Sequence, residues 1–531
     1  MPSLLPIKAR TELTRSLFRD IVNVNDYFYV FFGRTIPWST PTEIPPLLTD
    51  TLFSRNIVHK NIMAIKRIEP TDVVYMVNRV DWVTGTTYDR FDDAVDLSTK
   101  NFYVFNSANS CIYKCVNRQD YIDGSVVVPS THLPASASAE NFRTADGYWW
   151  RLIYFVPAAD TLKFLTSSYI PVRFFSSSTN FNCSGTVDTI TITAAGAGYT
   201  TTPTVIITGD GKGASAIATV VDETVVSVTV VSGGFGYSWA EVSFESSLGT
   251  GAIGTVNLND PNPPEGLNVA IAASAQANAG SIDFIDILNV NTGGRGANYT
   301  PETIFTISGD GENATVLVTF VEGGTGNINS IITGAKGQQY TTASVSTVGP
   351  GEGATLNPIL TPLYGHGGDV PDELLSTTVA ISVDVDSTDP AFFVNNDFRQ
   401  AGIIKNIKAY GVLGDIYNND MGDATYTIQV SDVGNYHDDD VINTDSGGLF
   451  TVIQISGNLV KLLPFIDIIS ETSALFNVTT SQALANMVVA NPYPLVPQIN
   501  TKTGDIVYVQ NFLPIERQVG QTETPTFYIT F

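Results

Sequence analysis

Residues 196–220 read GAGYTTTPTVIITGDGKGASAIATV, and variants of this pattern return three more times before residue 360. Val205 and Ile207 fall on one face of the segment, which is the period of a β-strand that buries one side. The GDGKG run supplies glycines that tolerate a positive φ in a tight turn. The segment ASAIATV then places three alanines on one face, and such small side chains allow close packing. The pattern therefore predicts compact antiparallel β-modules.

A tyrosine anchors each copy of the pattern, and the spacing of the tyrosines predicts how the copies are grouped. Tyr199, Tyr237, Tyr299 and Tyr340 are separated by 38, 62 and 41 residues. The widest interval holds an extra segment at 257–280, so we expect two pairs of repeats joined by a linker. Each tyrosine either fills the core of its module or belongs to an exposed aromatic platform for sugars, and we favour the core.

Outside the repeats, the sequence predicts one helix and many strands. Leu13, Leu17 and Ile21 recur every four positions with charged residues between them, which is typical of an amphipathic helix over 7–23. Aromatic and β-branched residues predict strands within 100–117, 147–157, 391–412, 450–470 and 524–531. The predicted fold class is therefore mainly β.

Composition and charge exclude several classes of protein. Of the 531 residues, 43% are hydrophobic and 15% are charged, which suits a chain with folded cores rather than a disordered one. The net charge of −25 repels phosphate backbones, so we expect no nucleic-acid partner. The N-terminus lacks the apolar core of a signal peptide, and no apolar run approaches the length of a membrane helix. We expect folding in a cytoplasm and no membrane span.

No set of residues in the sequence predicts a catalytic or zinc centre. The three cysteines, Cys111, Cys115 and Cys183, lack the spacing of a zinc site or a disulfide framework, so we interpret them as small buried side chains. The four histidines are isolated in sequence, and no serine stands in a G-x-S-x-G elbow. We therefore expect no cofactor and no enzymatic activity. A glycan-degrading site with two carboxylates is an alternative that no motif supports.

Acidic clusters are the remaining candidates for binding a cation. SVDVDSTDP, with Asp384, Asp386 and Asp389, and the triplet at 438–440 offer hard oxygen ligands, but the glycine and distal glutamate of an EF-hand loop are missing. We favour solvated acidic loops over calcium sites. For Asp210 and Asp310, in the two GDG turns, we favour capping of the turn.

Eight short motifs occur in a fixed order outside the repeats. They are FFGRTIPWS (31–39), NRVDWVTGTTYDRF (78–91), IYKC (112–115), DGYWWRLIYFVP (146–157), SYIPV (168–172), DFRQAGIIKNI (397–407), GDIVYVQNFLPIERQVGQTE (504–523) and YITF (528–531). Each motif is weak alone, but their order at both ends of the chain is specific.

This series resembles the baseplate wedge proteins (subunit eight) of contractile-tailed, myovirus-type phages. The resemblance covers roughly 1–175 and 390–531, whereas the repeats at 180–360 depart from the family. It implies a non-enzymatic structural subunit with a β-sandwich core built from both ends of the chain. It also implies a homodimer within each wedge that links neighbouring wedge proteins during tail contraction.

From the resemblance and the change in composition we predict three regions: 1–178 and 363–531 as the two parts of the core, and 179–362 as an inserted β-repeat region. The expected location is the tail baseplate of a virion, after assembly in the host cytoplasm. Expected partners are a second copy, other wedge proteins and tail-fibre proteins. The alternative function is a glycan- or receptor-binding tail adhesin that uses the repeats.

Nine residues of the motifs, which we call the signature residues, are candidates for specifying the fold or for forming an interface. Arg34 in particular is expected to form a buried ion pair with Asp81 or Asp146. The nine are Arg34, Trp38, Asp81, Trp82, Asp146, Gly147, Tyr148, Arg399 and Asn511.

Overall fold

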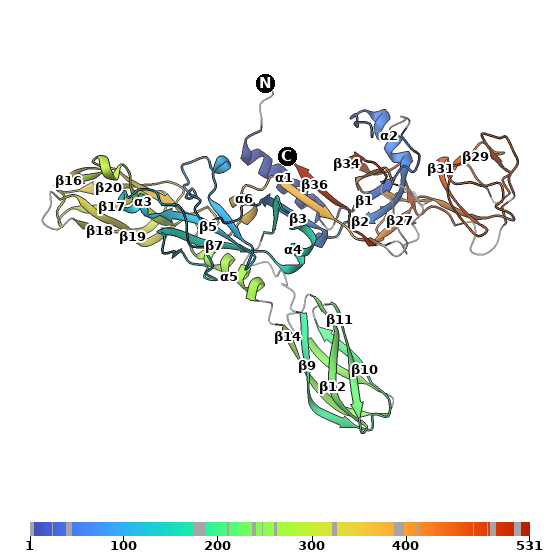
Figure 1. Ribbon diagram of the computed structural model, residues 1–531, viewed down its shortest axis with the longest axis horizontal. Coiled ribbons are helices and arrows are strands. Elements are labelled where there is room, and N and C mark those ends of the chain that lie inside the picture. Colours follow the sequence, from blue (N-terminus) through green and yellow to red (C-terminus); the bar gives the residue numbers. More distant parts are fainter. Residues whose placement is uncertain are drawn as a thin grey trace. The chain divides into compact units, whose positions relative to one another are not determined.

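Figure 1 shows the computed structural model of the chain. It describes residues 5–23, 25–38, 45–174, 186–209, 212–235, 240–246, 248–259, 263–320, 326–386, 398–411, 414–470, 472–485, 487–488, 495–514 and 522–531. Strands make up 46% and helices 13%, which confirms the prediction of a mainly β protein.

The helices exceed the single one predicted. The expected N-terminal helix is confirmed as α1, and five more α-helices lie in the described part of the chain. Most of these five are short, so their sequences contain too few turns to show a helical period. The six are α1 (Ile7–Ile21), α2 (Leu52–Asn61), α3 (Gln119–Asp123), α4 (Ala158–Phe164), α5 (Pro263–Ala277) and α6 (Val370–Glu373).

The chain divides into two compact units. Unit 1 comprises residues 1–11 and 75–377, and unit 2 comprises 12–74 and 378–531. The predicted boundaries after 178 and after 362 both fall inside unit 1, because the division follows contacts in space rather than the change in composition.

In unit 2, strands from both ends of the chain form one antiparallel sheet, with the two N-terminal strands flanked by C-terminal ones. Its order is β27 (Met421–Asp423), β2 (Ile62–Arg67), β1 (Phe28–Gly33), β25 (Gln400–Lys405) and β34 (Asp505–Asn511). Other strands of this unit are β23 (Thr378–Ser382), β24 (Val385–Asp386), β26 (Lys408–Ala409), β33 (Ile499–Asn500), β35 (Thr522–Glu523) and β36 (Thr526–Thr530).

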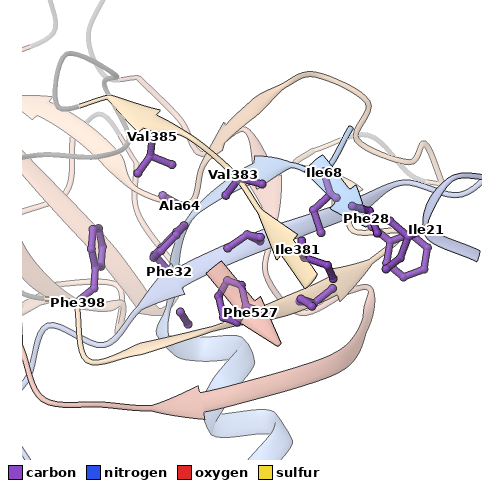
Figure 2. Packing of buried hydrophobic residues seen from close by; sticks show 14 of the residues in the cluster. Ile21, Phe28, Phe32, Ala64, Ile68, Ile381, Val383, Val385, Phe398 and Phe527 are labelled. Atoms are coloured by element: carbon purple, nitrogen blue, oxygen red, sulfur yellow. The ribbon is translucent and has the colours of Figure 1, made fainter. Parts of the chain in front are cut away.

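Strand β1 is buried on both faces, which explains its run of aromatic and β-branched residues. Phe28, Val30 and Phe32 pack with Ile381 and Phe527, from β23 and β36, in the core shown in Figure 2. The residues between them, including Tyr29 and Phe31, pack in a second core on the other face.

A second sheet of unit 2 has a core of its own. Its order is β28 (Tyr426–Gln429), β31 (Leu459–Ile466), β30 (Leu449–Ser456), β29 (Val441–Thr444) and β32 (Leu475–Asn477). Ile428, Phe450 and Leu462 are fully buried within it.

In unit 1, a four-stranded sheet carries helix α5. The sheet has the order β4 (Tyr103–Asn106), β5 (Cys111–Arg118), β7 (Tyr148–Phe155) and β6 (Phe142–Arg143), and β3 (Val73–Asn78) pairs separately with β8 (Tyr169–Val172). Ile271 of α5 packs in the core of the sheet, and the Asn268 side chain bonds both the N–H and the C=O of Phe155 at 2.8 Å. The expected linker at 257–280 therefore contains a helix that docks on β7.

The repeats form two modules that share three antiparallel strand pairings. Module one comprises β9 (Thr186–Ala197), β10 (Thr204–Gly209), β11 (Lys212–Val221), β12 (Thr224–Phe235), β13 (Ala240–Glu245) and β14 (Thr250–Asn259). Module two comprises β15 (Ile282–Ile287), β16 (Arg295–Ala297), β17 (Ile304–Gly309), β18 (Glu312–Phe320), β19 (Ile328–Gln338), β20 (Ala343–Val348), β21 (Glu352–Ala354) and β22 (Leu356–Leu360).

The correspondence between the modules holds strand by strand. The pairs β10–β13, β11–β12 and β9–β14 of module one recur as β17–β20, β18–β19 and, in two pieces, β15–β22 and β16–β21 of module two. All of these pairs are antiparallel, as the repeat pattern predicts.

Candidate functional site

The structure gathers the signature residues into two groups, one in each unit. The corner cluster, in unit 2, contains Arg34, Trp38, Arg399 and Asn511. The loop cluster, in unit 1, contains Asp81, Trp82, Asp146, Gly147 and Tyr148.

The corner cluster begins where β1 ends. A Cβ at Gly33 would lie 2.0 Å from the Asn61 carbonyl oxygen, so glycine is required for the close approach of β2 at this point. The N–H of Arg34 donates to the same oxygen at 3.1 Å. Arg34 then takes a left-handed φ of 57°, which turns the chain out of the strand.

Arg399 and Trp38 tie this corner to the C-terminal part of the unit. The Arg399 N–H bonds the carbonyls of Gly33 and Arg34 at 3.2 and 3.1 Å, and its guanidinium bonds the Thr35 carbonyl. The Trp38 indole N–H donates to the Phe512 carbonyl at 3.2 Å, while the Phe512 N–H donates to the Arg399 carbonyl at 3.0 Å. Three distant sequence motifs are thus joined mainly through backbone groups.

Asn511 extends the corner cluster along β34. Its side-chain carbonyl accepts a bond of 2.7 Å from Gln400, and its side-chain N–H donates to the Pro46 carbonyl at 2.9 Å. Asn511 and Gln400 are also paired in register across β25 and β34. The amide therefore connects a strand pair to the segment that precedes α2.

The side chain of Arg34 contacts residues of the same corner cluster segment. Its guanidinium lies 3.9 Å from the centre of the Trp38 ring and donates to the Pro37 carbonyl at 3.3 Å. Burial, reinforced by the nearby charge of Arg399, lowers the pKa of Arg34 from its ordinary value. Stacking on the indole face offsets part of this cost through cation–π attraction.

The loop cluster is organised around the buried carboxylate of Asp146. The N–H groups of Thr131 and His132 donate to Asp146 Oδ2 at 2.7 and 2.9 Å, and the Ser130 hydroxyl donates to the same atom at 3.0 Å. Thr144 donates to the other oxygen. Burial raises the pKa of Asp146, but these hydrogen bonds outweigh burial and hold the pKa below its ordinary value.

Trp82, in the motif NRVDWVTGTTYDRF, is linked to this carboxylate through Ser130. Its indole N–H donates to Ser130 Oγ at 3.1 Å, and Ser130 in turn bonds Asp146. Gly147 follows with a φ of 88°, and the Tyr148 hydroxyl donates to the Val128 carbonyl at 2.8 Å. The cluster fixes the loop at 125–133 onto the edge of the four-stranded sheet.

The predicted ion pair of Arg34 with Asp81 or Asp146 is wrong. Asp81 is bound instead by Arg79, whose Nε lies 3.0 Å from both carboxylate oxygens, and Asp146 is held by loop N–H and hydroxyl groups. The prediction assumed that a buried arginine needs a carboxylate, whereas Arg34 is held by a ring face and a carbonyl.

The three repeat tyrosines that the structure describes are core residues. Tyr199, Tyr299 and Tyr340 are 2%, 4% and 4% exposed, which confirms the favoured interpretation and removes them as a sugar platform. Tyr237 lies outside the described residues. The Tyr199 and Tyr299 hydroxyls occupy equivalent places, because they accept hydrogen bonds from the N–H groups of Ala252 and Ala354 at 3.2 and 3.1 Å.

Each described tyrosine lies against a glycine in the turn of the other repeat of its module. A Cβ at Gly351 would lie 2.3 Å from the Tyr299 ring, and a Cβ at Gly311 would lie 2.4 Å from the Tyr340 ring. In module two, each repeat therefore packs its tyrosine ring against the glycine turn of the other repeat, and we call this arrangement the exchange of tyrosines. Tyr199 shows the same arrangement in module one, where a Cβ at Gly249 would lie 2.3 Å from its ring.

Asp310 caps the segment that follows Tyr340. Its carboxylate accepts from the N–H groups of Thr341 and Thr342 at 2.8 and 2.9 Å, and the Thr341 hydroxyl bonds it as well. These bonds, led by the Thr341 hydroxyl, lower the pKa of Asp310. Asp310 therefore caps a distant segment, whereas the prediction was that it caps its own GDG turn, and Asp210 lies outside the described residues.

Unit 1 also contains a buried ion network that the sequence analysis did not predict. It links Lys114 of β5, Asp283 of β15, Lys336 of β19, His366 and Glu373 of α6. Lys114 Nζ bonds Glu373 Oε1, and these side chains are 0% and 2% exposed. His366 lies between the two carboxylates, with Nδ1 3.2 Å from Glu373 and Nε2 3.5 Å from Asp283.

The network connects module two to the four-stranded sheet. Asp283 accepts two bonds of 3.0 Å from Asn141 and one of 2.7 Å from Lys336. Arg151 of β7 bonds the Asn141 carbonyl oxygen at 3.1 Å and Ser274 Oγ of α5 at 2.9 Å. A charge inside an apolar strand, as in CIYKC and IDFIDI, is the signal that could have predicted these buried pairs.

The pKa of Glu373 shows that its charge is stabilised. Burial raises the pKa, but the charge of Lys114 and the hydrogen bond and charge of His366 outweigh burial and hold it at about 2. The carboxylate is therefore ionised at neutral pH. The network stabilises an arrangement of elements, and we assign no catalytic step to it.

The other candidate residues do not assemble into a site. Cys111 and Cys115 are free and buried, as expected, and burial raises the pKa of Cys111 to about 11. Cys183 and Asp389 lie outside the described residues. Asp384 is exposed and accepts a bond of 2.7 Å from Thr524. Within the described ranges, no group of three or more histidine, cysteine or acidic side chains is arranged to hold a metal ion.

Neither a protein-family model nor a curated protein matches this chain. In the part of the chain that the structure describes, no helix has the length and apolar character needed to span a bilayer.

Proposed function

We propose that this protein is a structural subunit of a phage tail baseplate wedge, as its motif series suggests. In this proposal it is not an enzyme, it forms a dimer within the wedge, and it links neighbouring wedge proteins while the tail contracts. The support is the behaviour of the signature residues. Eight of the nine bind one another or backbone groups of distant segments, as residues that specify a scaffold do, and the ninth, Asp81, bonds the side chain of nearby Arg79.

An exposed apolar surface on and before α2 also supports an assembly role. Leu47, Leu52 and Phe53 are 96%, 76% and 74% exposed, and Ile57 of the same helix is exposed as well. Only Val58 of this helix is buried. Clustered exposed apolar side chains typically mark surfaces that contact another protein.

The adhesin alternative keeps less support. Three of its four proposed sugar-binding rings are buried, so binding would need another surface of the modules. We assign the modules a role as spacers or as contacts to neighbouring baseplate or fibre proteins.

Localisation in the intact particle tests the proposal. An epitope fused after Phe531 should appear at the tail baseplate by immunogold electron microscopy, and density for this chain should occupy the wedge periphery in a reconstruction of the particle. Label on the capsid, on the tail tube or on no particle would contradict the proposal.

A matched pair of variants then tests the surface at α2. Phe53→Asp should reduce incorporation into the baseplate, since it places a charge on the apolar surface. Leu162→Asp, on α4, is the control because Leu162 is 90% exposed and lies outside that surface. Equal incorporation of both variants would exclude α2 as an assembly contact.

A further inference from the structure

Three consecutive valines beside the loop cluster are exposed. Val126, Val127 and Val128, which we call the valine segment, are 85%, 40% and 54% exposed. A single exposed valine is ordinary, but three in sequence present a continuous β-branched surface of the kind found in strands.

The backbone of the valine segment is held at both ends and unpaired between them. Asn291 donates to the Gly124 carbonyl at 2.7 Å, and Tyr148 donates to the Val128 carbonyl at 2.8 Å. The segment between these anchors contains no helix, turn or bend. None of its three N–H groups bonds a partner in the described ranges. An anchored segment outside helices and turns, with free N–H groups, can pair with an added strand.

A pocket adjoins the segment and contains a cation that no described carboxylate balances. The pocket has a volume of about 160 Å³, and Val126 and Val128 line it together with Arg118 and Arg143. Arg118 is neutralised by Asp120, which accepts two of its bonds at 3.0 Å. Asp146 also lines the pocket, but loop N–H and hydroxyl groups occupy its oxygens. Arg143 is exposed, and no described acid lies within ion-pair distance of it.

We propose that the valine segment is a strand-addition site for a partner protein. The partner contributes an extended segment that pairs with the backbone of Val126–Val128, and an acidic side chain of that segment enters the pocket and pairs with Arg143. Backbone pairing supplies affinity, and the pocket supplies selectivity for the acid. This inference does not depend on the tail location proposed above.

Labelled peptides and the full chain test the proposal by fluorescence anisotropy. The probe is a capped eight-residue peptide of alternating threonine and valine with a central aspartate, N-methylated along its outer edge to prevent self-association. A second probe has lysine in place of the aspartate. The aspartate probe should bind at least tenfold more tightly than the lysine probe.

Two variants locate the binding. Arg143→Glu should reverse the preference between the probes, whereas Arg55→Glu, an exposed arginine on α2, should not. Val127→Pro removes one free N–H and should abolish binding of both probes, with circular dichroism confirming that the chain is folded. Absence of binding up to millimolar probe, equal binding of the two probes, or unchanged binding by Val127→Pro would each overturn the proposal.

Discussion

Module one and module two share a strand plan but place one equivalent aspartate in opposite surroundings. In module one β14 pairs Leu258 with Val187, and in module two β22 pairs Leu360 with Ile282. The next residue along β9 is Asp188, which is exposed. The next residue along β15 is Asp283, whose side chain is 2% exposed and lies in the ion network.

The repeat specifies the module, whereas the outer face of the strand specifies its attachment. Both modules bury a tyrosine in the same way, so their internal packing follows the repeated sequence. Only Asp283 meets Lys336, His366 and Asn141, which come from elements around β15. The same residue type therefore acts as a surface charge in one copy and as an attachment in the other.

Replacing each of these two aspartates by alanine should give the largest difference in stability between the two modules. Asp283→Ala removes the buried carboxylate that binds half-buried Lys336, buried His366 and Asn141, and we expect a loss of about 3–5 kcal/mol in the free energy of opening of module two. Asp188→Ala should change the stability of module one by less than about 0.5 kcal/mol. Hydrogen–deuterium exchange of β15 and β9 measures both, and equal effects would refute the distinction.

Acid should loosen module two through Glu373. The pKa of this group is about 2 in the folded chain, below its ordinary value of 4.5. The stability that its charge contributes is therefore present above pH 4.5 and is lost as the pH falls towards 2, about 3 kcal/mol in all.

Exchange rates of β15 and β19 measured between pH 5 and pH 2, corrected for intrinsic exchange, test this prediction. Glu373→Gln should flatten the dependence on pH, and module one should show a smaller dependence. A slope that persists in Glu373→Gln would assign the effect to another group.

The glycines three residues before the tyrosines should be equally intolerant in both modules. A Cβ at Gly296 would lie 2.6 Å from the Tyr299 ring, and a Cβ at Gly196 would lie 2.8 Å from the Tyr199 ring. We expect each substitution to alanine to cost about 1–3 kcal/mol.

Gly293→Ala is the control that separates the cost of a steric clash from the cost of a strained backbone conformation. Gly293 has a φ of 100°, but a Cβ there would meet nothing within 4 Å, so we expect only the backbone cost of about 1 kcal/mol. Chemical denaturation followed by exchange in each module provides the measurement. A Cβ at Gly296 would also lie 2.5 Å from the Glu352 carbonyl oxygen, so a Gly296→Ala variant no worse than Gly293→Ala would contradict the close packing of both the ring and the backbone at Gly296.

Removing the tyrosine hydroxyl should have the smallest effect and should be the same in both modules. Tyr299→Phe and Tyr199→Phe each lose one bond from a backbone N–H, worth about 1 kcal/mol. Exchange of the Ala354 and Ala252 amides reports the loss directly. A large difference between the two variants would show that the modules differ in their cores and not only in their attachment.

Sequence patterns predicted the local features of this fold and missed the long-range ones. The alternation in TPTVIITG predicted a strand, because a strand period depends only on nearby residues. The partners of Lys114 and Arg34 could not be predicted, since each contact depends on which distant segments fold together. Lys114 reaches Glu373 across more than 250 positions, and the ring face that holds Arg34 becomes identifiable only once the corner is built.

The exchange of tyrosines in module two limits how such an array can change during evolution. Loss of one repeat would remove the glycine turn that packs on the tyrosine of the remaining repeat, and it would remove the tyrosine that packs on the remaining glycine turn. Gene duplication or recombination would therefore conserve the fold when it adds or removes repeats two at a time, in blocks of about eighty residues, so the number of repeats in related chains should be even.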